Sequence, residues 1–284
     1  MKRVLVTGAA GQLGRALIAA SPAQWQCRGL TRAELDLGDA RAIERLIAAE
    51  RPDLVINAAA YTAVDRAEAE PDLAMAINAR APGVLAGALR AYGGRLIQIS
   101  TDYVFDGRSA LPYLPGDPVN PQSVYGVTKA EGESAAGPEA IILRTSWVYA
   151  AGGRNFVTTM LRLMQGREEL NVVCDQIGAP SWAPEIARTV WQLAALDRPG
   201  IYHHRDAGQA SWHEFALAIA EEALALGLIE RAPKVHPITS AQYPTAARRP
   251  AFSLLDDSAT RALLGDGPAH WRDNLRRMLE EVAG

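Results

Sequence analysis

Short apolar runs alternate with longer amphipathic stretches along the first half of the chain. Mainly apolar runs of this kind are typical of strands that are buried on both faces of a sheet. They occur at Val4–Val6, Leu54–Ile56, Arg95–Ser100 and Ile141–Leu143, and Trp25–Leu30 is a weaker fifth candidate. The pattern predicts several buried strands before residue 150.

The stretches between these runs have the period of helices. Gly11–Ile18 follows the first run, Ala40–Ala49 carries one apolar stripe behind Asp39 as its N-cap, and Asn78–Ala91 is helical in pattern. Strands separated by helices imply parallel pairing with right-handed crossovers. We therefore expect an α/β fold with a doubly wound parallel sheet of the Rossmann type.

The second half of the chain is less regular. Its clearest element begins with a capping box at Ser211 and Glu214, which predicts a helix through Leu224. A chain of 284 residues has room for two domains of about 150 residues each. Because no linker rich in Gly, Ser or Pro separates the halves, we expect a smaller lobe packed on the sheet domain.

Composition narrows the class of protein. Hydrophobic residues make up 49% and charged residues 21%, and the formal net charge of −3 offers no basic excess for nucleic acid. No apolar run approaches the ~18 residues of a membrane span. Cys27 and Cys174 lie far apart and outside any CxxC pattern, so we expect reduced thiols in a cytoplasmic protein.

A glycine-rich turn follows the first predicted strand and opens the first predicted helix. Gly8, Gly11 and Gly14 are spaced as GxxGxxG. The first permits a tight turn, the second lets the backbone approach a diphosphate, and the third lets the helix pack closely on the strand. The N–H groups of the helix N-terminus then face the phosphates. In this context the turn indicates dinucleotide binding rather than a merely glycine-rich loop.

The second predicted strand leads to the segment that would meet the adenosine ribose. Arg32 suits a 2′-phosphate, and Glu34 is a candidate for the ribose diol. Arg32 is equally consistent with a solvated surface charge. The choice between NADPH and NADH therefore stays open, with dual use favoured.

A second chemical pattern is a Tyr and a Lys four residues apart, Tyr125 and Lys129, which share one helix face. A free phenol has a pKa near 10, and a neighbouring ammonium lowers that pKa towards the range useful for acid/base chemistry. Thr101 lies at the carboxyl end of a buried strand, where α/β sheets bind ligands. The three motifs together indicate a catalytic site rather than a packed Tyr and a surface Lys.

Strings along most of the chain resemble the dTDP-4-dehydrorhamnose reductases, extended short-chain dehydrogenases of sugar-nucleotide metabolism. The GxxGxxG spacing is typical of that group. The most specific strings are Ala-Tyr-Thr-Ala-Val-Asp at 60–65, Ser-Thr-Asp-Tyr-Val-Phe-Asp-Gly at 100–107 and Arg-Thr-Ser-Trp-Val-Tyr at 144–149. Further matches lie at Val124–Lys129, Gly153–Val157, Asp175–Pro180, Gly200–His203 and Arg249–Pro250.

The resemblance implies reduction of the 4-keto group of dTDP-4-dehydro-L-rhamnose by NADPH or NADH to give dTDP-L-rhamnose. Tyr125 would donate the proton, Lys129 would support the phenolate and hold the nicotinamide ribose, and Thr101 would bond the reacting oxygen. The expected cofactor-binding residues are Gly8, Gly11, Gln12, Leu13, Gly14, Arg32, Asp36, Leu37, Ala59, Ala60, Tyr61, Tyr125 and Lys129. Asp36 and Leu37 would lie near the adenine.

The expected partner is a small nucleotide sugar. The substrate-binding candidates are Thr101, Asp102, Tyr125, Trp147, Asn155 and Arg249. Trp147 matches a family Trp that contacts substrate, although core packing is the alternative for a lone Trp. Arg249 suits a diphosphate because its planar fork binds oxygens bidentately. Arg248 is the alternative ligand, and both could be surface charges.

No metal site is expected. The five histidines are not spaced with carboxylates or cysteines in a zinc pattern. Some members of the resembled family are Mg²⁺-linked dimers, but Arg15-Ala16-Leu17 of the first helix lacks the acidic side chain that such a site draws on. This argues against a Mg²⁺ bridge and leaves a homodimer through another surface open.

Two other functions compete with the reductase. A dehydratase on the same scaffold would carry an Asp-Glu pair after the catalytic Thr, and here Asp102 is followed by Tyr103. An epimerase is harder to exclude by motif. A non-catalytic regulatory relative need not keep the proton donor, which this chain keeps.

The resemblance also implies a division of the chain. We expect residues 1–147 to form the dinucleotide-binding domain and 148–284 to form mainly the sugar-nucleotide lobe. About residues 184–204 would return to the sheet. Val190–Leu196 and Gly200–His203 are the candidates for the late strand.

Overall fold

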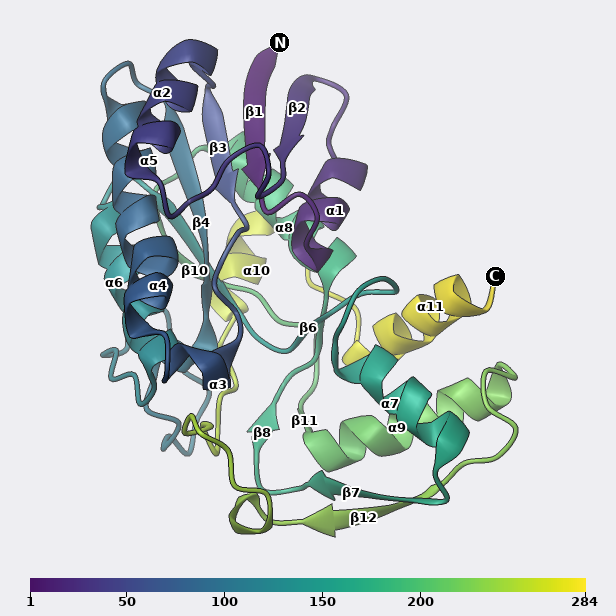
Figure 1. The fold of residues 1–284 in the computed structure, drawn as a ribbon. Coiled ribbons are helices and arrows are strands. Elements are labelled where there is room, and N and C mark those ends of the chain that lie inside the picture. The colour runs from purple at the N-terminus through teal and green to yellow at the C-terminus, as the bar shows by residue number, and fades with distance from the viewer.

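A six-stranded parallel sheet forms the centre of the molecule in the computed structural model, which describes residues 1–284 (Figure 1). The strand order is β10-β5-β4-β3-β1-β2. The strands are β1 (Lys2–Thr7), β2 (Trp25–Leu30), β3 (Leu54–Asn57), β4 (Arg95–Thr101), β5 (Ile141–Thr145) and β10 (Gly200–His203). The order reverses between β1 and β3, which confirms the doubly wound α/β prediction.

Helices cover both faces of this sheet because its strands are apolar on both faces. On β1, Val4 and Val6 pack in the cluster that contains α1 (Gln12–Ala19) and α8 (Ala183–Leu196). Leu5, between them, packs in the cluster of the opposite face. That face is covered by α2 (Ala40–Glu50), α5 (Ala81–Arg90) and α6 (Val124–Ala136) (Figure 1).

The predicted helices form, and one of them is longer and less regular than predicted. The Asp39 side chain accepts a hydrogen bond from the N–H of Ala42 and caps α2 as expected. The stretch predicted at Asn78–Ala91 begins earlier, with α4 (Pro71–Met75), and passes through a π-helical turn, η1 (Ala76–Arg80), before α5. Sequence periodicity does not reveal the π turn, because the added residue lies within one turn and the apolar spacing after it is again that of an ordinary α-helix.

One of the two candidates for the late strand is wrong. Val190–Leu196 lies inside α8, where Ile186, Val190 and Leu193 recur at helical spacing and are all buried. Its apolar residues make a short run that alone does not distinguish a strand from a buried helix. Gly200–His203 is confirmed as β10, which pairs in parallel with β5.

The C-terminal half adds a second core beside the sheet. It contains α7 (Phe156–Gly166), α9 (Trp212–Ala225) and α11 (Trp271–Ala283) over β7 (Glu169–Val173) and β12 (Lys234–Ile238), which pair in parallel (Figure 1). The capping box of Ser211 and Glu214 opens α9 as predicted. The short elements are α3 (Val64–Ala67), η2 (Asp102–Val104), β6 (Val148–Tyr149), β8 (Ile177–Gly178), β9 (Ser181–Trp182), β11 (Ala210–Ser211), η3 (Ser240–Gln242) and α10 (Ser258–Leu264). None of the helices combines the length and apolarity required to cross a bilayer.

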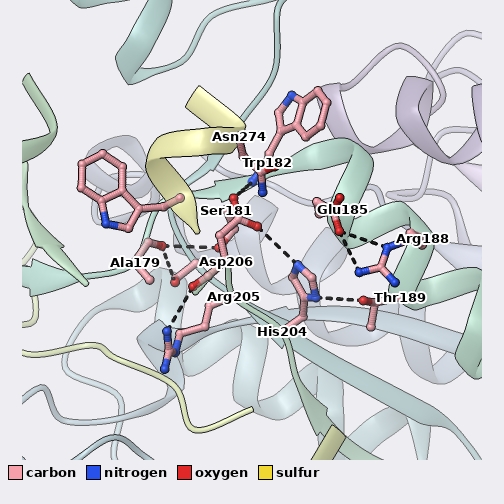
Figure 2. Close-up of polar contacts among 12 residues, drawn as sticks. Ala179, Ser181, Trp182, Glu185, Arg188, Thr189, His204, Arg205, Asp206 and Asn274 are labelled. Carbon is pink, nitrogen blue, oxygen red and sulfur yellow. Dashed lines mark hydrogen bonds and ion pairs between the residues drawn. The ribbon is translucent and has the colours of Figure 1, made fainter. Parts of the chain in front are cut away.

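A buried polar cluster joins the sheet to this second core (Figure 2). Asp206, just after β10, is fully buried, and its Oδ2 accepts a hydrogen bond from the N–H of Trp182 at 3.1 Å. His204 is also buried, and its Nδ1 lies 2.9 Å from Oγ1 of Thr189 on α8. The His204 Nε2 lies 3.8 Å from the Asp206 Oδ1, and neither atom has a hydrogen-bond partner. Asn274 of α11 lies beside the pair in Figure 2.

Candidate active site

A single large cleft, of about 700 Å³, opens at the carboxyl ends of the sheet strands. This is the edge at which open α/β sheets bind ligands, and the volume suits a small-molecule site. The predicted residues that line it are Gly8, Gly11, Gln12, Leu13, Arg32, Asp36, Leu37, Ala59, Ala60, Tyr61, Thr101, Asp102, Tyr125, Lys129 and Trp147. Residues far apart in the sequence are thus brought together as expected.

The glycine-rich turn is held by close backbone contacts. Gly8 has φ +69°, and an added Cβ there would lie 2.9 Å from the Ala59 Cα. A Cβ on Gly14 would lie 2.1 Å from the Gly8 carbonyl oxygen, which explains why Gly14 itself does not line the cleft. Gly11 is the N-cap of α1 and has no side chain to cover the first N–H groups of the helix. The turn therefore leaves room and free donors for a diphosphate, and these residues fit a dinucleotide.

Of the two charged residues predicted after β2, Arg32 faces the cleft and Glu34 is hydrogen-bonded within its own turn. Arg32 lines the cleft with an exposed side chain whose Nη2 lies 3.9 Å from the Asp36 Oδ2. Glu34 does not line the cleft, because its carboxylate accepts hydrogen bonds from the N–H and hydroxyl of Thr31. The structure therefore does not bring Glu34 to the ribose position, and Arg32 is the side chain left to meet a 2′-phosphate.

The first turns of α6 carry the proposed catalytic pair. The Ser123 hydroxyl accepts a hydrogen bond from the N–H of Gly126 and caps the helix. A Cβ on Gly126 would lie 2.3 Å from the Tyr103 carbonyl oxygen, so glycine lets the helix approach the segment after β4. Tyr125 and Lys129 both face the cleft, together with Thr101 at the end of β4. The Lys129 ammonium donates to the Ile99 carbonyl at 2.6 Å.

Burial dominates the protonation of these groups. It raises the pKa of Tyr125 above its usual value, and the contact with Thr101 opposes this only in part. Burial also lowers the pKa of Lys129 to about 8 and raises the pKa of Asp102 to about 6. The expected lowering of the Tyr125 pKa by Lys129 is not found, because burial penalises the phenolate and the ammonium is directed at the Ile99 carbonyl. The phenol thus keeps its proton at neutral pH, as a proton donor must.

A buried ion pair that the sequence analysis missed lies behind Lys129. Arg144 of β5 donates to both carboxylate oxygens of Glu133, at 2.8 and 2.6 Å, and both side chains are buried. Ser100, the residue before Thr101, donates its hydroxyl hydrogen to the same carboxylate. Glu133 follows Lys129 by four residues on α6, so the spacing that connects Tyr125 to Lys129 could have revealed it.

Two substrate candidates do not line the cleft. Asn155 caps α7 through the N–H of Thr158, and its amide donates to the Gln12 Oε1 at 2.8 Å. Arg249 makes an ion pair with Asp65 at 2.7 Å. Their polar groups hold distant segments of the chain together. The spacing of residues in the sequence does not reveal such a role. Conversely, Arg154 lines the cleft and was missed, because it is one exposed Arg in a loop.

The family model described as "RmlD substrate binding domain" matches residues 1–283. The chain belongs to this family. The match to the RmlD family covers both the sheet and the second core. It therefore includes the glycine-rich turn, the helix of Tyr125 and Lys129, and Trp147.

Individual members agree with this assignment. The chain is 41% identical to a dTDP-4-dehydrorhamnose reductase of Aggregatibacter actinomycetemcomitans, over 98% of each chain. The solved dTDP-4-dehydrorhamnose reductase of Clostridium acetobutylicum superposes with a TM-score of 0.93 at 36% identity, over 99% of this chain and 100% of that one. That of Bacillus anthracis, in complex with NADP, gives 0.92 at 34% identity over 99% of each chain.

Proposed function

We propose that this chain is an NADPH- or NADH-dependent reductase that converts dTDP-4-dehydro-L-rhamnose to dTDP-L-rhamnose. The observation that carries the proposal is that two features line one cleft. A glycine-rich turn suited to a diphosphate and the side chains of Thr101, Tyr125 and Lys129 all face it. The reductases that the chain resembles over nearly its full length support the substrate.

The cofactor would lie along the turn after β1. Gly8, Gly11, Gln12 and Leu13 would hold its diphosphate, Arg32 and Asp36 its adenosine end, and Lys129 its nicotinamide ribose. When bound, the reduced nicotinamide supplies a hydride to the keto carbon of the sugar.

The residues of the chain supply the proton and the charge stabilisation. The Tyr125 hydroxyl transfers its proton to the oxygen that becomes the 4-hydroxyl, and the Thr101 hydroxyl donates a hydrogen bond to that oxygen as negative charge develops. Lys129, in its ammonium form, stabilises the phenolate that Tyr125 leaves. A proton from solvent then restores the phenol.

The two cores divide this task in the proposal. Residues 1–147, with about 184–204 returning to the sheet, bind the cofactor and carry the catalytic groups, while 148–284 mainly bind the nucleotide sugar. β10 and α8 support this, because they pack with the sheet. Trp147 stands where the two parts meet and faces the cleft.

An assay with dTDP-4-dehydrorhamnose and NADPH tests the proposal. We expect the 340 nm absorbance of the reduced nicotinamide, a property of the cofactor, to fall in proportion to the dTDP-L-rhamnose formed. Product without net oxidation would indicate an epimerase, and the absence of chemistry would indicate a non-catalytic binder.

The Tyr125→Phe variant tests the assigned proton donor. It should lose at least about 100-fold in kcat, a typical contribution of a positioned general acid, with little change in the NADPH dissociation constant. Tyr92→Phe is the matched control, because the Tyr92 hydroxyl bonds the Pro52 carbonyl outside the cleft. Full activity in Tyr125→Phe would refute the assignment.

A further inference from the structure

Trp147 holds an unusual backbone conformation. Its φ is +48°, in the left-handed region that residues other than glycine rarely adopt. Trp147 follows the end of β5 and lines the cleft, and its carbonyl accepts a hydrogen bond from the N–H of Ser181. A strained residue of this kind persists only when its surroundings determine its conformation. Neighbouring residues must therefore hold the indole in place.

Trp212, the first residue of α9, covers one face of that indole. The two ring centroids lie 3.5 Å apart with an interplanar angle of 7°, so the rings are stacked face to face. Trp212 is itself packed against Phe156 of α7 at a centroid distance of 4.6 Å. The Trp147 indole is thus the end of an aromatic stack that begins in the second core.

Gly178 of β8 lies against the edge of the same indole. A Cβ added there would lie 2.7 Å from the Trp147 Cε2 and 2.8 Å from its Nε1. The Ser253 Oγ, 2.9 Å from the same point, limits movement in another direction. Gly178 has no positive φ, so it is glycine for space and not for backbone freedom.

Strand pairing places these two supports together. β8 and β11 pair in antiparallel fashion with Gly178 opposite Ala210, and the Ser211 cap then starts α9 at Trp212. Neither Gly178 nor Trp212 lines the cleft. Both contact Trp147, which does line it, so the two residues can act on a bound sugar through the Trp147 indole.

We propose that Trp212 and Gly178 are positioning residues that hold the Trp147 indole as a wall of the nucleotide-sugar site. They thereby set the affinity for the sugar nucleotide and leave the affinity for the cofactor unchanged. This inference rests on the proposed function, because it assigns the cleft beside Trp147 to the substrate. The nearest atoms at Gly178 belong to Trp147 and Ser253, and the rings packed on Trp212 are those of Trp147, Phe156 and Phe215; none of these residues belongs to the glycine-rich turn.

Variants on the two sides of the indole test the proposal. Gly178→Ala pushes the ring from its edge, and Trp212→Leu removes the stacking surface. Each should raise the KM for dTDP-4-dehydrorhamnose about tenfold, with kcat within about threefold and the NADPH dissociation constant within about twofold. Trp212→Phe, which keeps an aromatic face, should recover most of the loss. Adding Gly178→Ala to Trp147→Phe should cost less than the product of the single effects, since both act on one ring.

Matched controls separate positioning from folding. A Cβ on Gly87 of α5 would meet nothing within 4 Å, and Trp25 pairs with Trp191 outside the cleft. Gly87→Ala and Trp25→Phe should leave both affinities unchanged. Equal losses of sugar and NADPH affinity in Gly178→Ala and Trp212→Leu, or no loss in either, would overturn the proposal.

Calorimetric binding of dTDP-L-rhamnose provides the same comparison without turnover. If the wild type binds dTDP-L-rhamnose but does not oxidise NADPH, the proposed function fails, and the variants still test the positioning role through their dissociation constants. If the wild type does not bind dTDP-L-rhamnose, the positioning role is overturned as well.

Discussion

Replacing either member of the buried Asp206–His204 pair should make stability depend on pH, in opposite directions for the two variants. The perturbations are Asp206→Asn and His204→Gln. Burial raises the pKa of Asp206 to about 7 from 3.8 and lowers the pKa of His204 to about 3 from 6.5. Both effects favour the neutral forms of the two side chains in the folded protein.

The signs follow from proton counting. Asp206 alone binds its proton more tightly when folded, so its contribution to stability falls as pH rises from about 4 to 7. His204 alone binds its proton less tightly when folded, so its contribution falls as pH drops from 6.5 to about 3. Between about pH 4 and 6.5 the pair carries one proton in both the folded and the unfolded state. The two slopes therefore cancel in the wild type.

Each single variant removes that cancellation. Each pH unit is worth about 1.4 kcal/mol per uncompensated proton, so the change between pH 5.0 and 6.5 is about 2 kcal/mol. Relative to wild type, Asp206→Asn should lose about that much free energy of unfolding when pH falls across this interval. His204→Gln should lose a similar amount when pH rises.

Urea unfolding at pH 5.0, 5.75 and 6.5 measures these free energies. The double variant Asp206→Asn/His204→Gln serves as the control, because it should return to the wild-type pH dependence even if it is less stable overall. Single variants with the same pH slope as the wild type would refute the reasoning that burial keeps both side chains neutral.

Three further predictions concern the cleft. Gly14→Ala should weaken NADPH binding at least about tenfold in fluorescence titrations, because its Cβ would overlap the Gly8 carbonyl; unchanged binding would contradict the close packing of α1 on the turn. Arg32→Ala should raise the KM for NADPH about tenfold and leave that for NADH unchanged, so equal effects on both would exclude a 2′-phosphate contact. Glu133→Gln removes the carboxylate that keeps the pKa of Lys129 from falling further, so the alkaline limb of kcat/KM should move to lower pH. Ser100→Ala, which loses one hydrogen bond and no charge, should keep that limb in place.

The central sheet was largely predictable because strands that are buried on both faces leave short apolar runs in the sequence. Trp25–Leu30 was found to the residue as β2, although Leu30 is its only fully buried residue. Local sequence signals also predicted where α2 and α9 begin, because the side chains of Asp39 and Ser211 cap the helices that follow them. Val190–Leu196 shows the limit, since a buried helix and a buried strand share the same apolar run.

The lining of the cleft was predictable where a motif lies at the carboxyl end of a strand, and unpredictable where a polar side chain joins distant segments of the chain. The glycine-rich turn, Tyr125 and Lys129 meet as expected because strand ends bring them to one edge. Asn155, predicted to bind substrate, does not line the cleft, because its side chain caps α7 and bonds Gln12. Trp212 gave no signal, since its role depends on the β8–β11 pairing of distant segments.

The π-helical turn at Ala76–Arg80 allows one helical segment to serve two surfaces. Asn78 in this turn is buried, accepts a hydrogen bond from the N–H of Tyr61 and donates to the Tyr61 carbonyl and the Thr128 hydroxyl. Leu85, seven residues later, packs on the sheet. In an uninterrupted α-helix two residues seven apart would face the same side, and the wider turn offsets them by up to about 100°. The extra residue therefore rotates the later part of the helix relative to Asn78. The later part can cover the sheet, while Asn78 holds the loop that places Tyr61 in the cleft.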